Sequence, residues 1–329
     1  MLDIIINILT SGLPCVLLAL GIFLTFRILD FADLTAEGSF LIGASVSALL
    51  IVNGVNPWIA TFCSFLAGGA CGAITGVLNR YLKIPKLLSG IITMTACASI
   101  AMLIMGAQKG NTTSFASQIT FTNIQKGGSV QTIYTLFAPW RFVEEYNQWI
   151  IASPLGEIIK ILVMLFVVLV IMFGIYFFFG TEYGMAIRAT GLNENMSNSQ
   201  GINADITTIV CIAISNALIG LGGSLYVQDA KTVSTVSAAG YLVIGLASIL
   251  IGEAIFGKRS FKNWIISVAL GAIVYFIIIT IATRLGLPTE LKSLLYAVLI
   301  TIALCLPLIK TSLNNLFHKK QDIAKEARK

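Results

Sequence analysis

The sequence has little charge and almost no histidine. Only 11% of its 329 residues are charged, whereas 57% are hydrophobic; an average soluble domain has about 25% charged and about 45–50% apolar residues. This composition excludes an ordinary soluble globular protein. The one histidine, His318, lies in a basic C-terminal stretch, and no HExxH, Ser/His/Asp or metal-ligating pattern is present. We therefore expect no enzyme, no metal site and no cofactor bound by this chain.

Clustered cysteines, a cleavable leader and a basic patch are also missing. No CxxC or Cys/His cluster occurs, and every cysteine falls within an apolar run, as expected for reduced packing residues: Cys15, Cys63, Cys71, Cys97, Cys211 and Cys305. The N-terminus has Asp3 instead of a basic n-region, so we expect no removable signal peptide. The net charge of +6 is spread over loops and the C-terminal tail, which favours membrane orientation over nucleic-acid binding.

The chain instead has repeated apolar runs of the length that a helix needs to cross a hydrocarbon core of about 30 Å. The second run is too short alone, so we expect its helix to begin within Leu34–Phe40. The sequence predicts an all-α, polytopic membrane helix bundle of about nine (eight to ten) transmembrane helices. The candidate spans are Ile5–Phe26, Phe40–Val52, Pro57–Leu78, Leu87–Gly106, Ile159–Phe179, Ile206–Tyr226, Ala239–Phe256, Asn263–Thr283 and Leu291–Ile309.

Basic residues predict the orientation of the bundle in the lipid bilayer. If every span crosses once and the basic tail is cytoplasmic, 14 of the 21 Lys and Arg residues lie inside, as the positive-inside rule requires. The N-terminus is then outside and the C-terminus inside. Residues 1–310 form the transmembrane domain, 107–158 an external segment, 181–205 a cytoplasmic loop and 311–329 a basic cytoplasmic tail. The external segment is either a small cap or a docking surface for a partner.

Polar residues within the apolar runs are candidates for a transport pathway, because polar groups prefer the interior of a membrane bundle. The candidates are Thr35, Glu37, Thr93, Thr95 and Asn216. Local hydrogen bonding within a helix explains the threonines equally well. Asp30, Asp33 and Glu37 lie close together in the sequence and mark either a polar cavity or a solvated loop.

Two glycine patterns have different interpretations. Gly68, Gly72 and Gly76 recur every fourth residue within one span, which favours close helix packing. Gly252, Gly257 and Lys258 match the G-x-x-x-x-G-K phosphate-binding pattern, but Arg259 stands in place of Ser or Thr and the glycines end an apolar span instead of linking a strand to a helix. We expect no nucleotide site there.

The most informative polar segment is TEYGMAIRATGLNENMSNSQGINAD, residues 181–205. Its pattern T-x-x-G-x-A-x-R-A-x-G-x-N, followed by G-I-N, resembles the cytoplasmic loop of ATP-binding-cassette (ABC) importer permeases of the branched-chain amino acid and ribose permease superfamily. Ala19–Ala44 and Ser215–Tyr226 resemble that family's first helix, its following broken segment and a later glycine-rich helix. The chain departs from the family at Ser197–Gln200 and in its acidic residues near position 33.

This resemblance implies a multi-pass permease in the cytoplasmic membrane of a prokaryote. It implies two ABC ATPase subunits, an extracytoplasmic substrate-binding protein and a second permease subunit, expected to be a second copy of this chain. ATP and Mg are then used by the ATPase, whose closure drives alternating access. The motif match assigns ATPase coupling to Gly184, Arg188, Ala189, Gly191 and Asn193.

The resemblance further suggests an amino acid as the substrate, in the branch paired with binding proteins for aromatic amino acids such as tryptophan or tyrosine. Import of a nucleoside or a sugar by the same mechanism remains open. Two other hypotheses are a secondary transporter driven by an ion gradient, indicated by Asp30, Asp33, Glu37 and Glu253, and a membrane enzyme that uses paired carboxylates.

Overall fold

The computed structural model describes residues 2–106, 118–120, 132, 154–235, 240–284, 298 and 301. Over these ranges the chain is almost entirely helical, and seven helices are long and apolar enough to cross a membrane. The prediction of a polytopic membrane helix bundle is thus confirmed. Apart from Val298 and Thr301, the predicted last span, Leu291–Ile309, lies outside the described residues, as do the basic tail and most of the external segment.

The first half of the bundle follows the expected order with one irregular turn. Helix α1 (Leu2–Phe23) continues as the π-helical turn η1 (Leu24–Ile28), and α2 (Thr35–Val52) begins within the interval predicted for it. Helix α3 (Pro57–Arg80) begins at a proline capped by the Asn56 side chain, which accepts a hydrogen bond from the Trp58 amide. Helix α4 (Lys86–Gly106) completes this half.

The second half has two short helices between two long ones. Helix α7 (Pro154–Phe178) is followed by α8 (Glu182–Leu192) and α9 (Glu194–Ser199), and then by α10 (Ala204–Ala230). Helix α12 (Tyr241–Phe256) has only 16 residues, and α13 (Phe261–Arg284) is the last helix in the described part of the chain. Thr181 and Asn193 cap α8 and α9, so side-chain oxygens accept the amides that these helices leave unpaired.

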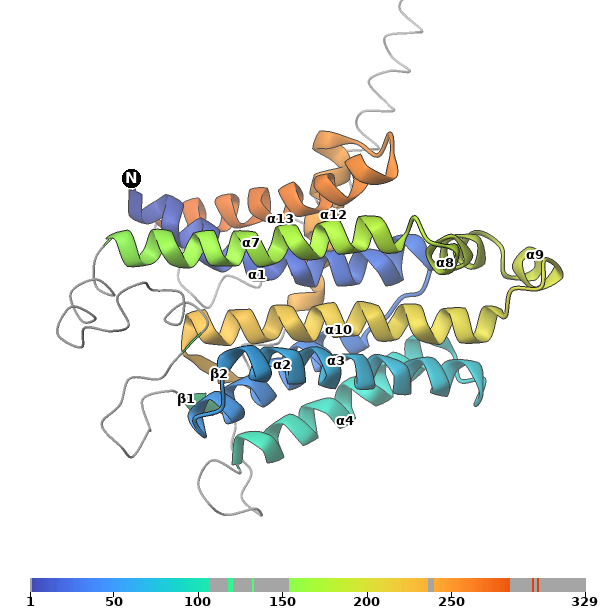
Figure 1. The fold of residues 1–329 in the computed structure, drawn as a ribbon, viewed down its shortest axis with the longest axis horizontal. Helices are drawn as coiled ribbons and strands as arrows, with labels where there is room; N and C mark the ends of the chain where they lie inside the picture. Colours follow the sequence, from blue (N-terminus) through green and yellow to red (C-terminus); the bar gives the residue numbers. More distant parts are fainter. Residues whose placement is uncertain are drawn as a thin grey trace, which may run out of the picture.

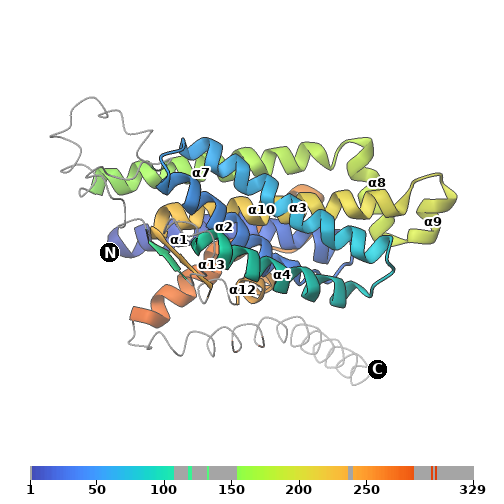
Figure 2. The same cartoon turned by 90° about the horizontal axis from the view of Figure 1, so that it is seen from below.

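A two-stranded ribbon was not predicted from the sequence. Strand β1 (Gln118–Thr120) pairs antiparallel with β2 (Thr232–Ser234), with Ile119 opposite Val233. Three-residue strands carry too weak a pattern to be found beside the strong helical periodicity. The ribbon lies at one end of the bundle and α8 and α9 at the other, as Figures 1 and 2 both show.

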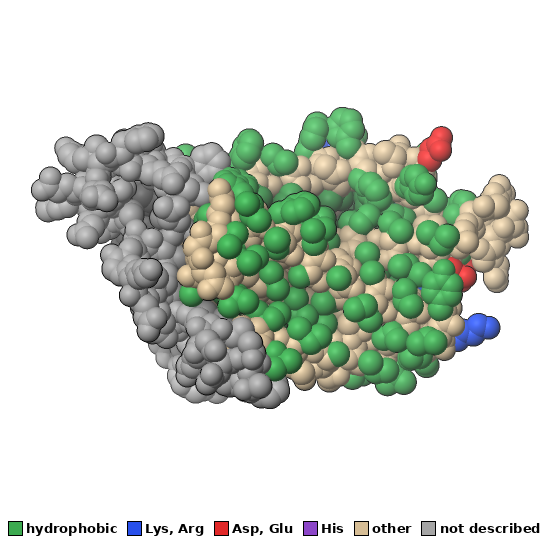
Figure 3. Space-filling model, turned by 60° about the horizontal axis from the view of Figure 1, so that its bottom comes forward, with side chains coloured by type: hydrophobic (Ala, Val, Ile, Leu, Met, Phe, Trp, Pro, Cys, Tyr) green, Lys and Arg blue, Asp and Glu red, His purple; other side chains and the backbone are tan. Residues whose placement is uncertain are grey.

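Helices α1 and α10 form the centre of the bundle, and α7 lies at its periphery. Helix α10 packs against α1, α2 and α3. In the most apolar stretch of each span, 83% of the residues are buried for α1 but only 17% for α7. Figure 3 shows hydrophobic side chains spread over the face it draws, with most of the visible charged side chains at the end that carries α8 and α9. An apolar outer surface is what a lipid-facing bundle requires.

The glycine stripe of α3 lies against α10. A Cβ at Gly72 would lie 2.5 Å from the Ile212 carbonyl oxygen, and one at Gly76 would lie 2.9 Å from Ile209 Cα. A Cβ at Gly68 would overlap the Asn216 carbonyl oxygen. The two backbones therefore approach more closely than any larger residue on this face of α3 would permit.

Candidate functional site

The chain between η1 and α2 interrupts the first pair of spans. The Leu29 amide still bonds to the Leu24 carbonyl, and the Phe31 amide to the Thr25 carbonyl at 2.9 Å. Asp30 then adopts a left-handed backbone with φ of 51°. Regular helix resumes only at Thr35, so residues 29–34 cross part of the bundle as irregular backbone. Irregular backbone at membrane depth occurs where protein or a water-filled cavity surrounds it.

A buried polar cluster surrounds this break; we call Asp33, Thr35, Thr75 and Asn216 the Asp33 cluster. Oδ1 of Asp33 accepts a hydrogen bond from the Thr35 amide at 2.8 Å, and Oδ2 accepts one from Asn216 Nδ2 at 2.6 Å. The Thr35 and Thr75 hydroxyls lie 2.7 Å apart. All four residues are buried. A buried carboxylate is costly unless it is hydrogen-bonded, and both oxygens of Asp33 have partners.

A second polar cluster joins α2, α3 and α10 nearer the end of the bundle that carries the ribbon. The Ser224 hydroxyl bonds to the Ser47 hydroxyl at 2.8 Å, and Gln228 Nε2 donates to the Thr61 hydroxyl at 2.9 Å. All four side chains are buried. The interior between these three helices is thus lined with uncharged hydrogen-bonding groups as well as with Asp33.

Glu37 lies beside an aromatic cluster. Its Oε1 accepts a hydrogen bond of 3.0 Å from the amide of Gly240, at the start of α12. One turn further along α2, the Phe40 ring stacks on the Tyr241 ring at 4.1 Å between centroids. The Tyr226 ring lies 5.7 Å from Phe40 and 5.6 Å from Tyr241. We call Phe40, Tyr226 and Tyr241 the aromatic cluster.

Three other polar candidates lie apart from these clusters. Thr93 is buried, and its hydroxyl bonds to the Ser89 carbonyl of its own helix. Thr95 is exposed on α4 and likewise bonds to its own helix. Asp30 is exposed, and its carbonyl accepts a hydrogen bond from Lys86 at 3.0 Å. The structure therefore brings Thr35, Asn216 and Asp33 together. The hydroxyls of Thr93 and Thr95 instead form hydrogen bonds to carbonyls of their own helix.

Helix α8 contains most of the residues that match the family's coupling motif. A Cβ at Gly184 would overlap the carbonyl oxygen of Phe178, and one at Gly191 would overlap that of Ile28 and lie 3.0 Å from Leu29 Cα. The two glycines therefore let α8 lie directly against the end of α7 and against the break after η1. Arg188 is exposed, and its guanidinium carbon lies 4.9 Å from the centroid of the Phe261 ring on α13.

Beside the packed glycines, α8 and α9 carry large hydrophobic side chains that are exposed. Leu192 is 89% exposed and Tyr183 is 77% exposed, and Met185 and Met196 are also exposed. Ala189 is half-buried, and Asn193 is exposed and caps α9. Exposed hydrophobic residues grouped on a polar segment mark a protein interaction surface. We call Tyr183, Met185, Leu192 and Met196 the α8–α9 surface.

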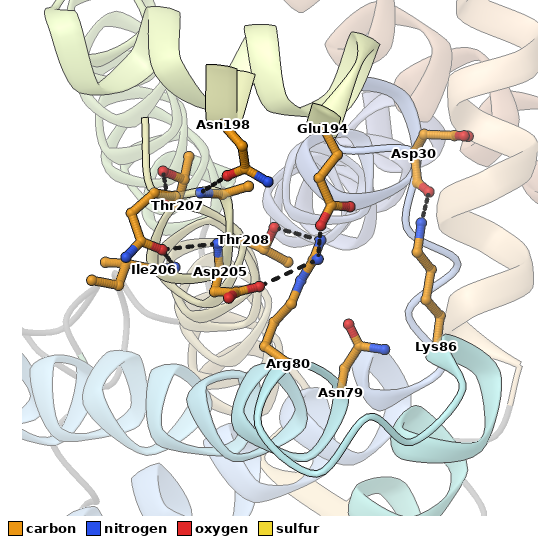
Figure 4. Close-up of polar contacts among 12 residues, drawn as sticks. Asp30, Asn79, Arg80, Lys86, Glu194, Asn198, Asp205, Ile206, Thr207 and Thr208 are labelled. Atoms are coloured by element: carbon orange, nitrogen blue, oxygen red, sulfur yellow. Dashed lines mark hydrogen bonds and ion pairs between the residues drawn. The ribbon is translucent and has the colours of Figure 1, made fainter. Parts of the chain in front are cut away.

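Arg80 joins the α8–α9 region to two long helices. At the end of α3, its guanidinium forms an ion pair with Glu194 of α9, a second ion pair of 3.6 Å with Asp205, and a hydrogen bond of 2.8 Å to the Thr208 hydroxyl. Figure 4 shows the Arg80 side chain pointing between Glu194 and the first turn of α10. The Arg80 side chain is only 13% exposed, whereas Glu194 is 43% and Asp205 57% exposed, so solvent screens these ion pairs from the acidic side.

The residues that match the phosphate-binding pattern pack and end helix α12. Gly252 lies within α12 against the Ser267 carbonyl of α13, and Gly257 ends α12 with φ of 75°. Glu253, between them, accepts hydrogen bonds from Arg27 and from the Trp264 indole. Among the residues that the structure describes, no three His, Cys, Asp or Glu side chains group closely enough to hold a metal ion.

Sequence reasoning missed several members of these clusters. Thr75 and Arg80 lie at the end of a predicted span, where polar residues are common and carry no specific signal. Glu194 lies in the coupling loop but outside the motif, and its partner is 114 residues away in the chain. Ser224 and Gln228 lie eight and twelve residues after Asn216 on α10, and polar residues recurring at multiples of four within an apolar helix could have indicated them.

Comparison with known proteins agrees with the sequence motifs. Residues 4–304 match the family described as branched-chain amino acid transport system / permease component. The chain is 34% identical over 297 residues to a tyrosine transport system permease protein of Clostridioides difficile (strain R20291), covering 90% of this chain and 89% of that protein.

More distant relatives are named for the transport of other solutes. The chain is 28% identical over 272 residues to a probable branched-chain amino acid transport permease protein, LivH, of Methanocaldococcus jannaschii, covering 80% and 78% of the two chains. It is 22% identical over 296 residues to the ribose import permease protein RbsC of Escherichia coli (strain K12), covering 90% and 80%. No solved structure matches the chain significantly. The chain therefore belongs to the branched-chain amino acid transport permease family, as a multi-pass membrane permease component of an ABC importer and not a catalytic subunit.

Proposed function

We propose that this chain conducts an aromatic amino acid by alternating access, driven by two copies of a separate ATPase and supplied by an extracytoplasmic binding protein. One observation carries the proposal: α8 has exposed hydrophobic side chains and, at Gly191, lies against the break after η1. A movement imposed on α8 would act directly on the segment that leads to Asp33. Mg and ATP belong to the ATPase in this proposal.

The contacts of α8 and α9 support coupling at more than one point. Gly191 lies against Ile28, Arg188 stacks on Phe261, and Glu194 pairs with Arg80. Helices α8 and α9 are thereby connected to the first span, to α13 and to α3. Coupling between distant sites requires such a continuous set of contacts with two alternative arrangements.

The proposed orientation has the N-terminus outside and α8 and α9 in the cytoplasm, with nine spans in all. In its support, basic residues gather at the end of the bundle that carries α8. Arg27, Arg80 and Lys258 lie there, each in contact with a residue of that end. Cytoplasmic loops carry an excess of Lys and Arg close to the ends of the spans. Residues 107–158 are then external, as is the ribbon.

For the pathway we propose the interior lined by the Asp33 cluster, Glu37 and the aromatic cluster. Discontinuous helices often form transporter sites, because chain breaks offer unpaired polar groups at membrane depth. Here both α2 and α12 begin next to these residues, with Glu37 bonded to the first turn of α12. Thr93 and Thr95 stay in the proposal as residues of α4, which packs on α2.

An aromatic amino acid is the proposed substrate on two grounds. A relative that aligns with 90% of the chain is named a tyrosine transport permease. In addition, the aromatic cluster beside Glu37 offers rings for an aromatic side chain and a carboxylate for an ammonium group. Ribose and nucleoside permeases among the relatives make a sugar or a nucleoside the alternative cargo.

The test is reconstitution of the permease with its ATPase and binding protein in proteoliposomes. We expect uptake of radiolabelled tyrosine or tryptophan that requires ATP inside and the binding protein outside, with two permease chains in each complex. Uptake driven by an imposed ion gradient without ATP would contradict the mechanism. ATP-dependent uptake of ribose or a nucleoside in preference to both amino acids would contradict the substrate alone.

A further inference from the structure

A groove of about 300 Å³ lies on the outer surface between α7 and α13. One wall is a single face of α7, because its members recur three and four residues apart. The other wall is the first turns of α13. The lining residues are Leu169, Met172, Phe173, Tyr176, Lys262, Ile265 and Ile266.

Aromatic rings pack together at the α8 end of the bundle, and the α7 wall of the groove is exposed. At the end that carries α8, the Phe179 and Phe261 rings lie 5.2 Å apart, and the Arg188 guanidinium lies over the Phe261 ring. Further along α7, Phe173 is 64% exposed and Leu169 is also exposed. The apolar walls of the groove thus belong to the span that is least buried in the bundle, where the hydrocarbon of the bilayer surrounds the protein.

Lys262 is the one charged residue among those that line the groove, and its ammonium group lies at the edge of the apolar lining. It is exposed, and within the described ranges it forms no ion pair with a carboxylate. Lys258 and Arg259 lie in the turn that precedes α13 and are also exposed. Glu253, a carboxylate on the preceding helix, is already bonded to Arg27 and Trp264. The charge at this end of the groove is therefore not neutralised by the acidic residue closest to it in sequence.

We propose that the groove binds one anionic phospholipid, with an acyl chain along α7 and α13 and the headgroup phosphate at Lys262. Basic pockets between transmembrane helices attract anionic headgroups, and the apolar walls match an acyl chain. Such a lipid would hold α7 and α13 together next to the Arg188–Phe261 contact. The inference does not depend on the transported solute.

Native mass spectrometry of the purified permease–ATPase complex tests the proposal. The complex is titrated with phosphatidylglycerol and, separately, with phosphatidylcholine of the same acyl chains. We expect one phosphatidylglycerol per permease chain to bind more tightly than phosphatidylcholine. Lys262→Gln should weaken phosphatidylglycerol binding about fivefold, the effect of one basic residue near an anionic headgroup, without changing phosphatidylcholine binding.

Two further variants complete the design. Lys83→Gln removes another exposed basic residue in the turn between α3 and α4 and should leave lipid binding unchanged. Leu169→Trp adds bulk to the groove and should remove the tightly bound lipid while the thermal stability of the complex is retained. Equal binding of the two lipids, or unchanged binding in Lys262→Gln or Leu169→Trp, would overturn the proposal. Dissociation of the two permease chains by Leu169→Trp would also overturn it, because a second copy would then occupy the groove.

Discussion

The side-chain amide of Asn216 donates a hydrogen bond of 2.6 Å to Oδ2 of Asp33 and so joins the middle of α10 to the break between η1 and α2. The other oxygen of Asp33 accepts the Thr35 amide at the start of α2. One carboxylate therefore fixes both the beginning of a helix and its place against the central helix of the bundle.

Replacing Asp33 should destabilise the permease. Asp33→Ala leaves the Thr35 amide and one N–H of the Asn216 side chain without an acceptor, because the other N–H still reaches the Ile212 carbonyl. Each unsatisfied buried group costs about 1–3 kcal/mol. We expect a lower midpoint of thermal unfolding for the purified protein in detergent. Asp30→Asn, in the same segment but exposed and with a side chain that also tolerates the left-handed backbone, is the control and should change stability by no more than about 0.5 kcal/mol. Equal midpoints for the two variants would refute this role of Asp33.

The close approach of α3 and α10 leads to a second prediction. Gly72→Ala places a methyl group against the Ile212 carbonyl, and such overpacking costs about 1–3 kcal/mol. Gly174→Ala on α7, where no atom lies within 4 Å of the added methyl, should be neutral or stabilising by up to about 1 kcal/mol. Unfolding of both variants by denaturant measures the difference. A Gly72→Ala protein as stable as the wild type would contradict the observed packing.

The pair of Arg80 and Glu194 should be energetically coupled. A double-mutant cycle of Arg80→Ala and Glu194→Ala is expected to give a coupling energy of about 0.5–3 kcal/mol, the range for side chains in one ion-pair network. Arg80→Ala alone should cost more than Glu194→Ala, because it also removes the contacts with Asp205 and Thr208. Additive effects of the two substitutions on the unfolding free energy would mean that the pair contributes nothing.

The α8–α9 surface should bind the ATPase. Leu192→Ala removes the most exposed large side chain of this surface and should weaken binding by about 1–2 kcal/mol, as for a hydrophobic contact residue. The measurement is the dissociation constant of the purified permease and ATPase. Leu162→Ala, on the exposed face of α7, is the matched control. Equal affinities for the two variants would place the ATPase elsewhere.

Much of the fold could be predicted because membrane spans have a strong, local signal. The apolar run before Val52 was too short, and the start of its helix within Leu34–Phe40 followed from span length alone; the structure has it at Thr35. The ribbon of β1 and β2 was not predictable in the same way, since its strands lie more than 100 residues apart and only the folded bundle brings them together.

The candidate site could be predicted only in part. Thr35 and Asn216 are predicted because they are polar residues in apolar runs, and they do lie together in the Asp33 cluster. Their connection through Asp33 depends on the irregular path of residues 29–34, which no periodicity describes. The position of Gly191 against Ile28 likewise depends on how α8 folds back on the bundle, whereas the motif indicates only that the glycine matters.

The central claim, that α8 couples ATP hydrolysis to transport through its contact with the first span, is tested most directly by the number of solute molecules imported per ATP hydrolysed. The assay uses the reconstituted importer and the solute that stabilises its binding protein. Gly191→Ala, which places a methyl group against Ile28, should keep ATPase binding but lower this ratio about tenfold, equivalent to about 1.4 kcal/mol. Gly174→Ala should leave the ratio unchanged. A Gly191→Ala importer with the wild-type ratio would contradict the account.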